Sequence, residues 1–153
     1  MAAKKGVKVY NADEVTIVFG ASILDSGFAD GEFLRVEQDT DDTEDFVGTD
    51  GEVTISRTND RRATMTVVLM QTSSGNDEMT VYSNLTRNSP NFTGAILPMA
   101  VKDQNGRTLH EGTHCWVAKA PDRSFDRGPQ RVEWKIRVAH LDRVDGGNND
   151  AIA

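Results

Sequence analysis

The chain has 153 residues, of which 37% are hydrophobic and 27% are charged, and its formal net charge is −7. This length fits one domain with a buried core, and the acidic balance excludes a broad cationic surface for nucleic acid. A single cysteine, Cys115, excludes an intrachain disulfide framework. The start of the chain has no apolar run long enough for a signal peptide or a membrane helix, which predicts synthesis in a cytoplasm without membrane binding.

In chain order, residues 1–12 predict a flexible arm, and alternating apolar residues then predict strands near 15–19, 34–37, 53–56 and 63–69. A helix is predicted over 75–88, with Ser74 as its cap and Pro90 as its stop. Asn105-Gly106 predicts a hairpin, and 131–138 gives the clearest strand pattern. Residues 145–153 predict a flexible tail.

Roughly eight strands and one helix predict a mainly β fold, either an antiparallel sandwich or a barrel with the helix packed over one end. The expected single domain covers residues 13–144 and includes a long loop over 37–61. The triplet Asp-Gly-Glu occurs at 30–32 and at 50–52, each time before a predicted strand, and predicts a turn in both places.

The stretch from Val36 to Val53 holds eight acidic residues and no lysine or arginine, so it carries the negative charge of the chain. It fails the position rules of an EF-hand loop, which leaves weak divalent-cation binding or a solvated loop open. Phe46 and Val47 within it favour a third interpretation, a loop that contacts another subunit. The residues proposed for this contact are Asp41, Asp42, Glu44, Asp45, Phe46 and Val47.

The outward face of the predicted strand 131–138 is basic, with Arg131, Lys135 and Arg137 on one side. Such a face is either solvated or complementary to an acidic surface on a neighbouring copy. We therefore predict it as the candidate partner of the acidic loop.

The segment His110-Glu-Gly-Thr-His114 matches the pattern of zinc peptidases, but that chemistry requires a helix. The local sequence predicts a strand, on which four residues span about 13 Å, so the two histidines would share a face without sharing a metal. Cys115 is predicted to be a buried structural thiol. No catalytic residue, metal site or cofactor is predicted, and the chain is not expected to be an enzyme.

Four blocks of sequence together resemble the tail tube proteins of bacteriophages with contractile tails. They are "VTIVFG" (15–20), "GFADGEFLRVEQ" (27–38), "VGTDGEVTISRTNDRRATMTVVLMQTSSGND" (47–77) and "PDRSFDRGPQRVEWKI" (121–136). The resemblance extends over roughly residues 13 to 140. It rests on the succession of blocks and on no catalytic motif.

This resemblance implies a virion protein whose hexameric rings stack into a tube, with a channel for the genome. The implied partners are further copies of the chain, a tail sheath protein, a tape measure protein, and baseplate and tail-terminator proteins. DNA would pass transiently and without specificity, and an anionic lumen would let it slide. A tube subunit of a contractile injection system and a calcium- or sugar-binding β-sandwich are the alternatives.

Overall fold

The structure of the protein, a computed structural model, describes residues 6–24 and 27–150. Within these residues it contains one α-helix, α1 (Gly75–Asn88), and the short 3-10 helices η1 (Ala12–Glu14) and η2 (Pro90–Phe92). Its strands are β1 (Val15–Phe19), β2 (Ser22–Leu24), β3 (Leu34–Gln38), β4 (Thr43–Val47), β5 (Val53–Arg57), β6 (Ala63–Met70), β7 (Leu97–Asp103), β8 (Leu109–Lys119), β9 (Arg131–Val138) and β10 (Asp142–Val144).

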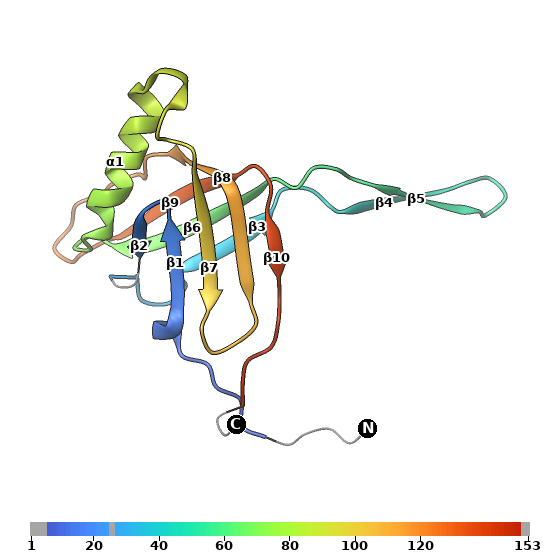
Figure 1. Cartoon of the computed structure of the whole chain (residues 1–153), viewed down its shortest axis with the longest axis horizontal. Helices are drawn as coiled ribbons and strands as arrows, with labels where there is room; N and C mark the ends of the chain where they lie inside the picture. The colour runs from blue at the N-terminus through green and yellow to red at the C-terminus, as the bar shows by residue number, and fades with distance from the viewer. Residues whose placement is uncertain (1–5, 25–26, 151–153) are drawn as a thin grey trace.

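Most strands form one antiparallel sheet in the order β2-β1-β7-β8-β9-β6-β3, with β10 on β8, while β4 and β5 pair only with each other. The large sheet folds around a core, and α1 covers one end of it (Figure 1). The predicted mainly β fold with one helix, consistent with a β-sandwich, is confirmed.

Strand β8 connects the two halves of the sheet because its pairing partners change along its length. The first part of β8, up to Gly112, pairs with β7, and Leu109–Glu111 within it also pair with β10. Cys115 pairs with both Leu97 of β7 and Val138 of β9, and the paired residues after it pair with β9. The register with β7 shifts between these two parts, so an extra residue bulges out of the ladder. The bulge lets one strand turn from one wall of the core to the other.

The core is built from residues that alternate along the strands. On β9, Val132, Trp134, Ile136 and Val138 are buried, which confirms the period-two prediction. Trp134 Nε1–H donates a hydrogen bond of 2.9 Å to Asn76 Oδ1, so the one polar atom of the indole is satisfied inside the core. Fully burying side chains of this size contributes roughly 1.5–3 kcal/mol each.

Helix α1 has the predicted bounds, and its apolar side faces the core through Met79 and Tyr82. The predicted capping by Ser74 is wrong, because its backbone is helical and its side chain makes no capping hydrogen bond. Ser73 supplies the acceptor instead, since its Oγ lies 3.2 Å from the backbone N of Gly75. A run of two serines left the position of the cap ambiguous in the sequence.

The predicted turns are present. Gly31 and Gly51 have φ values of 88° and 87°, a conformation that suits glycine, within the two Asp-Gly-Glu triplets. Asn105-Gly106 lies in the connection between β7 and β8, where Asp103 accepts a backbone hydrogen bond from Gly106. The segment 37–61, which is predicted as a long loop, contains the two strands of the β4–β5 hairpin.

The two ends of the described chain contact each other. Lys8 pairs with Asp150 at 2.7 Å, and Asn148 Nδ2 donates a hydrogen bond to the backbone oxygen of Val9. The outer parts of the predicted flexible arm and tail, residues 1–5 and 151–153, lie outside the described residues. The expected flexibility of both segments stays a prediction.

Candidate functional site

The β4–β5 hairpin projects from the body of the protein as an isolated ribbon (Figure 1). Every residue of both strands is exposed. At its tip, the backbone N of Gly48 donates to the oxygen of Glu52 at 2.8 Å, and Asp50 accepts from the backbone N of Glu52 at 3.0 Å. A two-stranded hairpin is marginally stable alone in water, and in the described chain this ribbon pairs with no other strand.

The register of the hairpin sorts its side chains onto two faces. Val47 pairs with Val53 and Asp45 pairs with Ile55, so one face carries three β-branched apolar residues. Phe46 pairs with Thr54 on the opposite face. The neighbours Phe46 and Val47, predicted as one apolar contact, therefore point to opposite sides and are 51% and 69% exposed.

Val53 and Ile55 were predicted as strand residues without a role, yet they are 58% and 72% exposed beside Val47. The signal for their position beside Val47 is the turn at 50–52, because it folds the strand that holds them back onto the acidic stretch. A hairpin register drawn from that turn would have placed Val53 opposite Val47.

The proposed acidic residues divide between the root and the shaft of the hairpin. Asp42 lies at the root, where its backbone oxygen accepts from Thr58 N at 2.8 Å and its side chain accepts from Gln38 Nε2 at 2.6 Å. Glu44 and Asp45 lie in β4 and are exposed, as is Asp41 before it. Within the described part of the chain no group of three His, Cys, Asp or Glu side chains could hold a metal ion.

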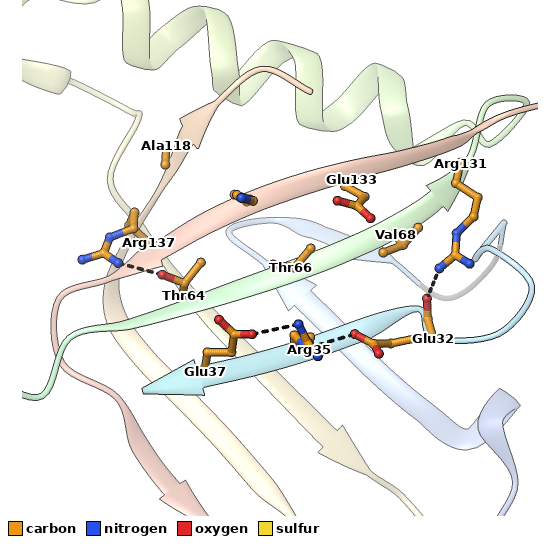
Figure 2. A pocket seen from close by; sticks show the side chains of 11 residues that line it. Glu32, Arg35, Glu37, Thr64, Thr66, Val68, Ala118, Arg131, Glu133 and Arg137 are labelled. Atoms are coloured by element: carbon orange, nitrogen blue, oxygen red, sulfur yellow. Dashed lines mark hydrogen bonds and ion pairs between the residues drawn. The ribbon is translucent and has the colours of Figure 1, made fainter. Parts of the chain in front are cut away.

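A second surface is the outer face of β3, β6 and β9, which is hollowed into an open concavity of about 820 Å³ (Figure 2). Its centre is lined by Thr64, Thr66 and Val68 of β6. Charged side chains of both signs surround them: Arg35, Arg131, Lys135 and Arg137 against Glu32, Glu37 and Glu133.

Most of the cations on this face already have partners in the same chain. Arg35 lies 3.3 Å from Glu32 and 3.0 Å from Glu37, and Arg131 donates to the backbone oxygen of Glu32 at 2.7 Å. For Lys135 no carboxylate lies within ion-pairing distance among residues 6–24 and 27–150.

Arg137 of β9 bonds to Asp39, the residue that directly follows β3. Its Nη1 donates to Asp39 Oδ1 at 2.9 Å and to Thr64 Oγ1 at 2.7 Å, and the two charged side chains are only 27% and 19% exposed. The hydrogen bond from Arg137 lowers the pKa of Asp39 from its usual value. One acid of the sequence's negative stretch is therefore bonded to the predicted basic face within the protomer.

The structure thus brings Arg131, Lys135 and Arg137 onto one face, as predicted. It does not bring them to the acidic hairpin residues of the same chain, because the hairpin leaves the body beyond the end of β3 (Figure 1). Contact between these two sets of residues would require a second copy.

The two histidines of the zinc-like pattern lie in different environments, and the prediction that they share a face is wrong. The bulge in β8 falls between them, so His110 is 7% exposed whereas His114 is exposed. His110 Nε2 lies 2.8 Å from Asp145 Oδ1, and His114 Nδ1 lies 2.9 Å from Thr113 Oγ1.

Cys115 is fully buried at the same bend, and burial raises the pKa of its thiol to about 11. A thiol with such a pKa is protonated at neutral pH and is a poor nucleophile. The prediction of a buried thiol is confirmed.

No helix in the described residues is long and apolar enough to cross a membrane.

A mostly antiparallel β protomer with a projecting ribbon and a hollowed sheet face fits the class of structural proteins that build assemblies. The profile of the family described as bacteriophage PhiTE tail tube protein matches residues 10–146. The chain belongs to this family of phage tail tube proteins, which confirms the resemblance found in the sequence blocks.

One curated protein and several solved structures are similar to the chain. "Structural protein ORF10" of Pseudomonas phage KPP10 is 29% identical over 144 residues, covering 91% of this chain and 83% of that protein. The sheath/tube terminator of an extracellular contractile injection system, PVC, has a TM-score of 0.63 at 12% identity, covering 94% and 100% of the two chains.

Two further solved structures share the fold. The tube terminating cap of the anti-feeding prophage has a TM-score of 0.60 at 8% identity, with 94% of each chain covered. A chain of the virion of a native gene transfer agent particle has a TM-score of 0.58 at 12% identity, covering 90% and 100%. At these identities the likeness shows the fold alone.

Proposed function

We propose that this protein is a tail tube subunit that assembles into hexameric rings, and that the rings stack into the channel for genome delivery. The observation that carries the proposal is the β4–β5 ribbon, whose apolar side chains are exposed and have no cover within the described chain. A ribbon that is marginal alone gains stability when a second copy covers it. Membership of the tail tube family supplies the context.

Ring closure would use two strand edges of the same protomer. Among the described residues, no strand pairs with the outer edge of β3 or with the second edge of β8 after Cys115. These edges lie at opposite sides of the four strands β3, β6, β9 and β8. Pairing each β3 with the next copy's β8 would build a closed barrel without exposed edges.

In such a ring the hollowed face of β3, β6 and β9 is the candidate lining of the channel. Of its four cations, Arg35 and Arg137 are paired with carboxylates and Arg131 is bonded to a backbone oxygen, which leaves Lys135 without an ion pair in the described chain. A neutralised wall gives DNA phosphates few free cations to bind, which favours sliding. The predicted anionic lumen would arise where the acidic hairpins reach the channel.

The other partners follow from the role of a tube subunit. A tail sheath protein would surround the tube, a tape measure protein would occupy it before ejection, and baseplate and tail-terminator proteins would close its ends. The finished location is the tail of the virion, after synthesis in the host cytoplasm. No enzymatic activity is proposed.

Negative-stain microscopy of the purified protein tests the proposal. We expect rings with sixfold class averages and tubes built from them at high protein concentration. Sedimentation that shows only a monomer at every accessible concentration, together with absence of the chain from purified virions, would overturn it.

The similarity to a terminator of an extracellular contractile injection system favours one second candidate, a tube subunit of such a system. Its protomer and assembly would follow the same physical rules. Mass spectrometry of purified particles separates the two candidate functions. A phage tail tube subunit would be found in DNA-filled virions, whereas a subunit of an injection system would be found in particles without DNA.

A further inference from the structure

Two lysines lie directly opposite each other on the outer face of the sheet. Lys119 of β8 is the Cα partner of Lys135 of β9, and both residues are exposed. Like charges in opposite positions of an antiparallel pair repel each other and destabilise the pair. For Lys135 no carboxylate lies within 4.0 Å among residues 6–24 and 27–150. The protomer therefore holds two like charges together and leaves one of them without an ion pair.

A shift of register places Lys119 on this face. Val117, two residues earlier, is buried and is the partner of Ile136. An unbroken ladder would therefore place Lys119 opposite the buried Trp134. The register instead shifts by one residue between Val117 and Lys119, and Lys119 meets Lys135. Bulges of this kind redirect side chains and are frequent next to active sites, and here the shift turns a lysine away from the core and toward a second cation.

The two lysines line a small concavity together with a third cation. Its volume is about 240 Å³, and its charged lining residues are Lys119, Asp122, Arg131, Glu133 and Lys135. Three cations and two carboxylates leave the concavity with one net positive charge. Sites for drug-sized ligands begin at roughly 300 Å³, so this concavity suits a single small anionic group.

The cations of this concavity are only partly neutralised within the described chain. Lys119 lies 3.6 Å from Asp122, but the two side chains are 73% and 95% exposed, so the ion pair contributes little. Arg131 donates to the backbone oxygen of Glu32 at 2.7 Å, which uses one of the five N–H donors of its guanidinium. Glu133 forms no ion pair within the described ranges of the chain.

We propose that Lys119, Arg131 and Lys135 form a binding site for one phosphate group. A phosphate offers several acceptor oxygens, which match a planar guanidinium beside two ammonium groups. An anion held between the two lysines would also remove their mutual repulsion. The phosphate belongs either to free inorganic phosphate or to the backbone of a nucleic acid, and the experiment below distinguishes these sources.

A nucleic-acid backbone fits the place of the site in the sheet. Arg131 and Lys135 also line the hollowed face of β3, β6 and β9, which is the candidate wall of the channel (Figure 2). Contacts to backbone phosphates weaken as salt rises and carry no sequence information, so DNA could be held transiently and still slide. The assignment to DNA rests on the proposed function, whereas the phosphate site itself does not.

Lysine protection tests the site in the full chain, at concentrations below those at which tubes form. Acetylation of each lysine by an N-hydroxysuccinimide ester is measured by mass spectrometry in sodium phosphate and in sodium chloride of equal ionic strength. We expect phosphate to slow the modification of Lys119 and Lys135 about twofold or more. Lys102 of β7, which forms no ion pair in the described residues, should react equally in both salts. A short DNA duplex replaces phosphate in the second arm.

Two neighbouring substitutions on the same face of β9 should have opposite effects. Lys135→Gln should weaken binding of the duplex about tenfold and lower the slope of log affinity against log salt by about one. Glu133→Gln removes a carboxylate from the concavity and should strengthen binding. Lys102→Gln is the matched control and should leave binding unchanged. Fluorescence anisotropy of a labelled duplex, with inorganic phosphate as competitor, measures these affinities.

The possible outcomes separate the site from the proposed function. Equal reactivity of Lys119 and Lys135 in phosphate and in chloride would overturn the site, and so would equal protection of Lys102, which indicates general screening. Protection by phosphate and not by the duplex would support the site and assign it to free phosphate. Absence of rings and tubes from the unaltered protein would contradict the proposed function and leave a measured phosphate site standing.

Discussion

Gly112 shows how one residue permits the shape of the whole sheet. A Cβ built at this position would lie 2.4 Å from Val138 Cγ1 and 3.1 Å from the backbone oxygen of His140. Only glycine lets β8 approach β9 and its following turn this closely at the bulge. The bend of β8, and with it the closure of the core, therefore depends on a missing side chain.

We expect Gly112→Ala to lower the free energy of unfolding by roughly 1–3 kcal/mol, because the added methyl group overpacks a fixed backbone. Urea unfolding followed by tryptophan fluorescence measures it. Gly128→Ala is the control, since nothing lies within 4 Å of a Cβ built there, and it should be close to neutral. Equal stability of the two variants would contradict the role of Gly112.

Asp39 and Arg137 give a stability contribution that depends on pH. The pKa of Asp39 is lowered in the folded protein by the hydrogen bond from Arg137, so the native state favours the ionised carboxylate. A lowered folded pKa stabilises the protein above the ordinary pKa of the acid, and the contribution is lost as the pH falls.

We therefore expect Asp39→Asn to reduce stability by about 1 kcal/mol at neutral pH, a modest value because the pair is partly exposed. The difference from the unaltered protein should shrink as the pH is lowered from about 5 toward about 2. Urea unfolding of both proteins across this range measures it. A difference that stays constant with pH would show that the carboxylate charge is not responsible.

At the scale of elements, the hairpin differs from every other strand pair in the described chain because it buries nothing. Strands elsewhere gain stability from the core beneath them, as β9 does through Val132, Trp134 and Ile136. The hairpin has only its own cross-strand pairs, each worth roughly 0.2–1 kcal/mol. Its apolar residues are therefore expected to act in association more than in folding.

Phe46→Ala tests this division between folding and assembly. The melting temperature of the protomer should change little, because the side chain is half exposed in the protomer, whereas tube yield should fall about tenfold. Val81→Ala, at a site 58% exposed on α1, is the matched truncation and should not reduce yield. Equal tube yields from Phe46→Ala and the unaltered protein would remove Phe46 from the interface.

At the scale of the whole molecule, contacts within a ring and contacts between rings have different physical origins. Edge pairing of β3 with β8 would use backbone hydrogen bonds, which respond weakly to salt. Contacts between rings that involve the acidic hairpin would use exposed charges, which are screened over about 8 Å at physiological ionic strength.

We therefore expect added sodium chloride, from about 0.05 M to about 0.5 M, to shorten tubes while single rings remain. Dynamic light scattering with negative-stain images measures tube length, and the melting temperature of the protomer reports whether the fold is affected. Tubes that keep their length at high salt would point to an apolar stacking contact without an electrostatic part.

The local features were predictable from the sequence. Period-two patterns located β6 and β9, the helix predicted over 75–88 matches α1, and the Asp-Gly turns marked two of the positive-φ glycines, Gly31 and Gly51. These signals are local because backbone conformation and burial alternate with a fixed period. The basic face of Arg131, Lys135 and Arg137 was also predictable from the sequence, because residues two apart on a strand share a side.

Other features arise only when distant segments meet. The pairing of Asp39 with Arg137 spans the sheet, the bulge that separates His110 from His114 depends on the register with β7, and the isolation of the hairpin depends on where β3 and β6 end. Sequence spacing does not encode these relations because each is set by packing between strands far apart in the chain. The sequence by itself determined the helix, most of the long strands and the family, but not β2, β4 or β10. The tertiary structure decided which charges are bonded within the chain, as Asp39 and Arg137 are, and which, such as Glu44 and Asp45 of the hairpin, have no ion-pair partner among residues 6–24 and 27–150.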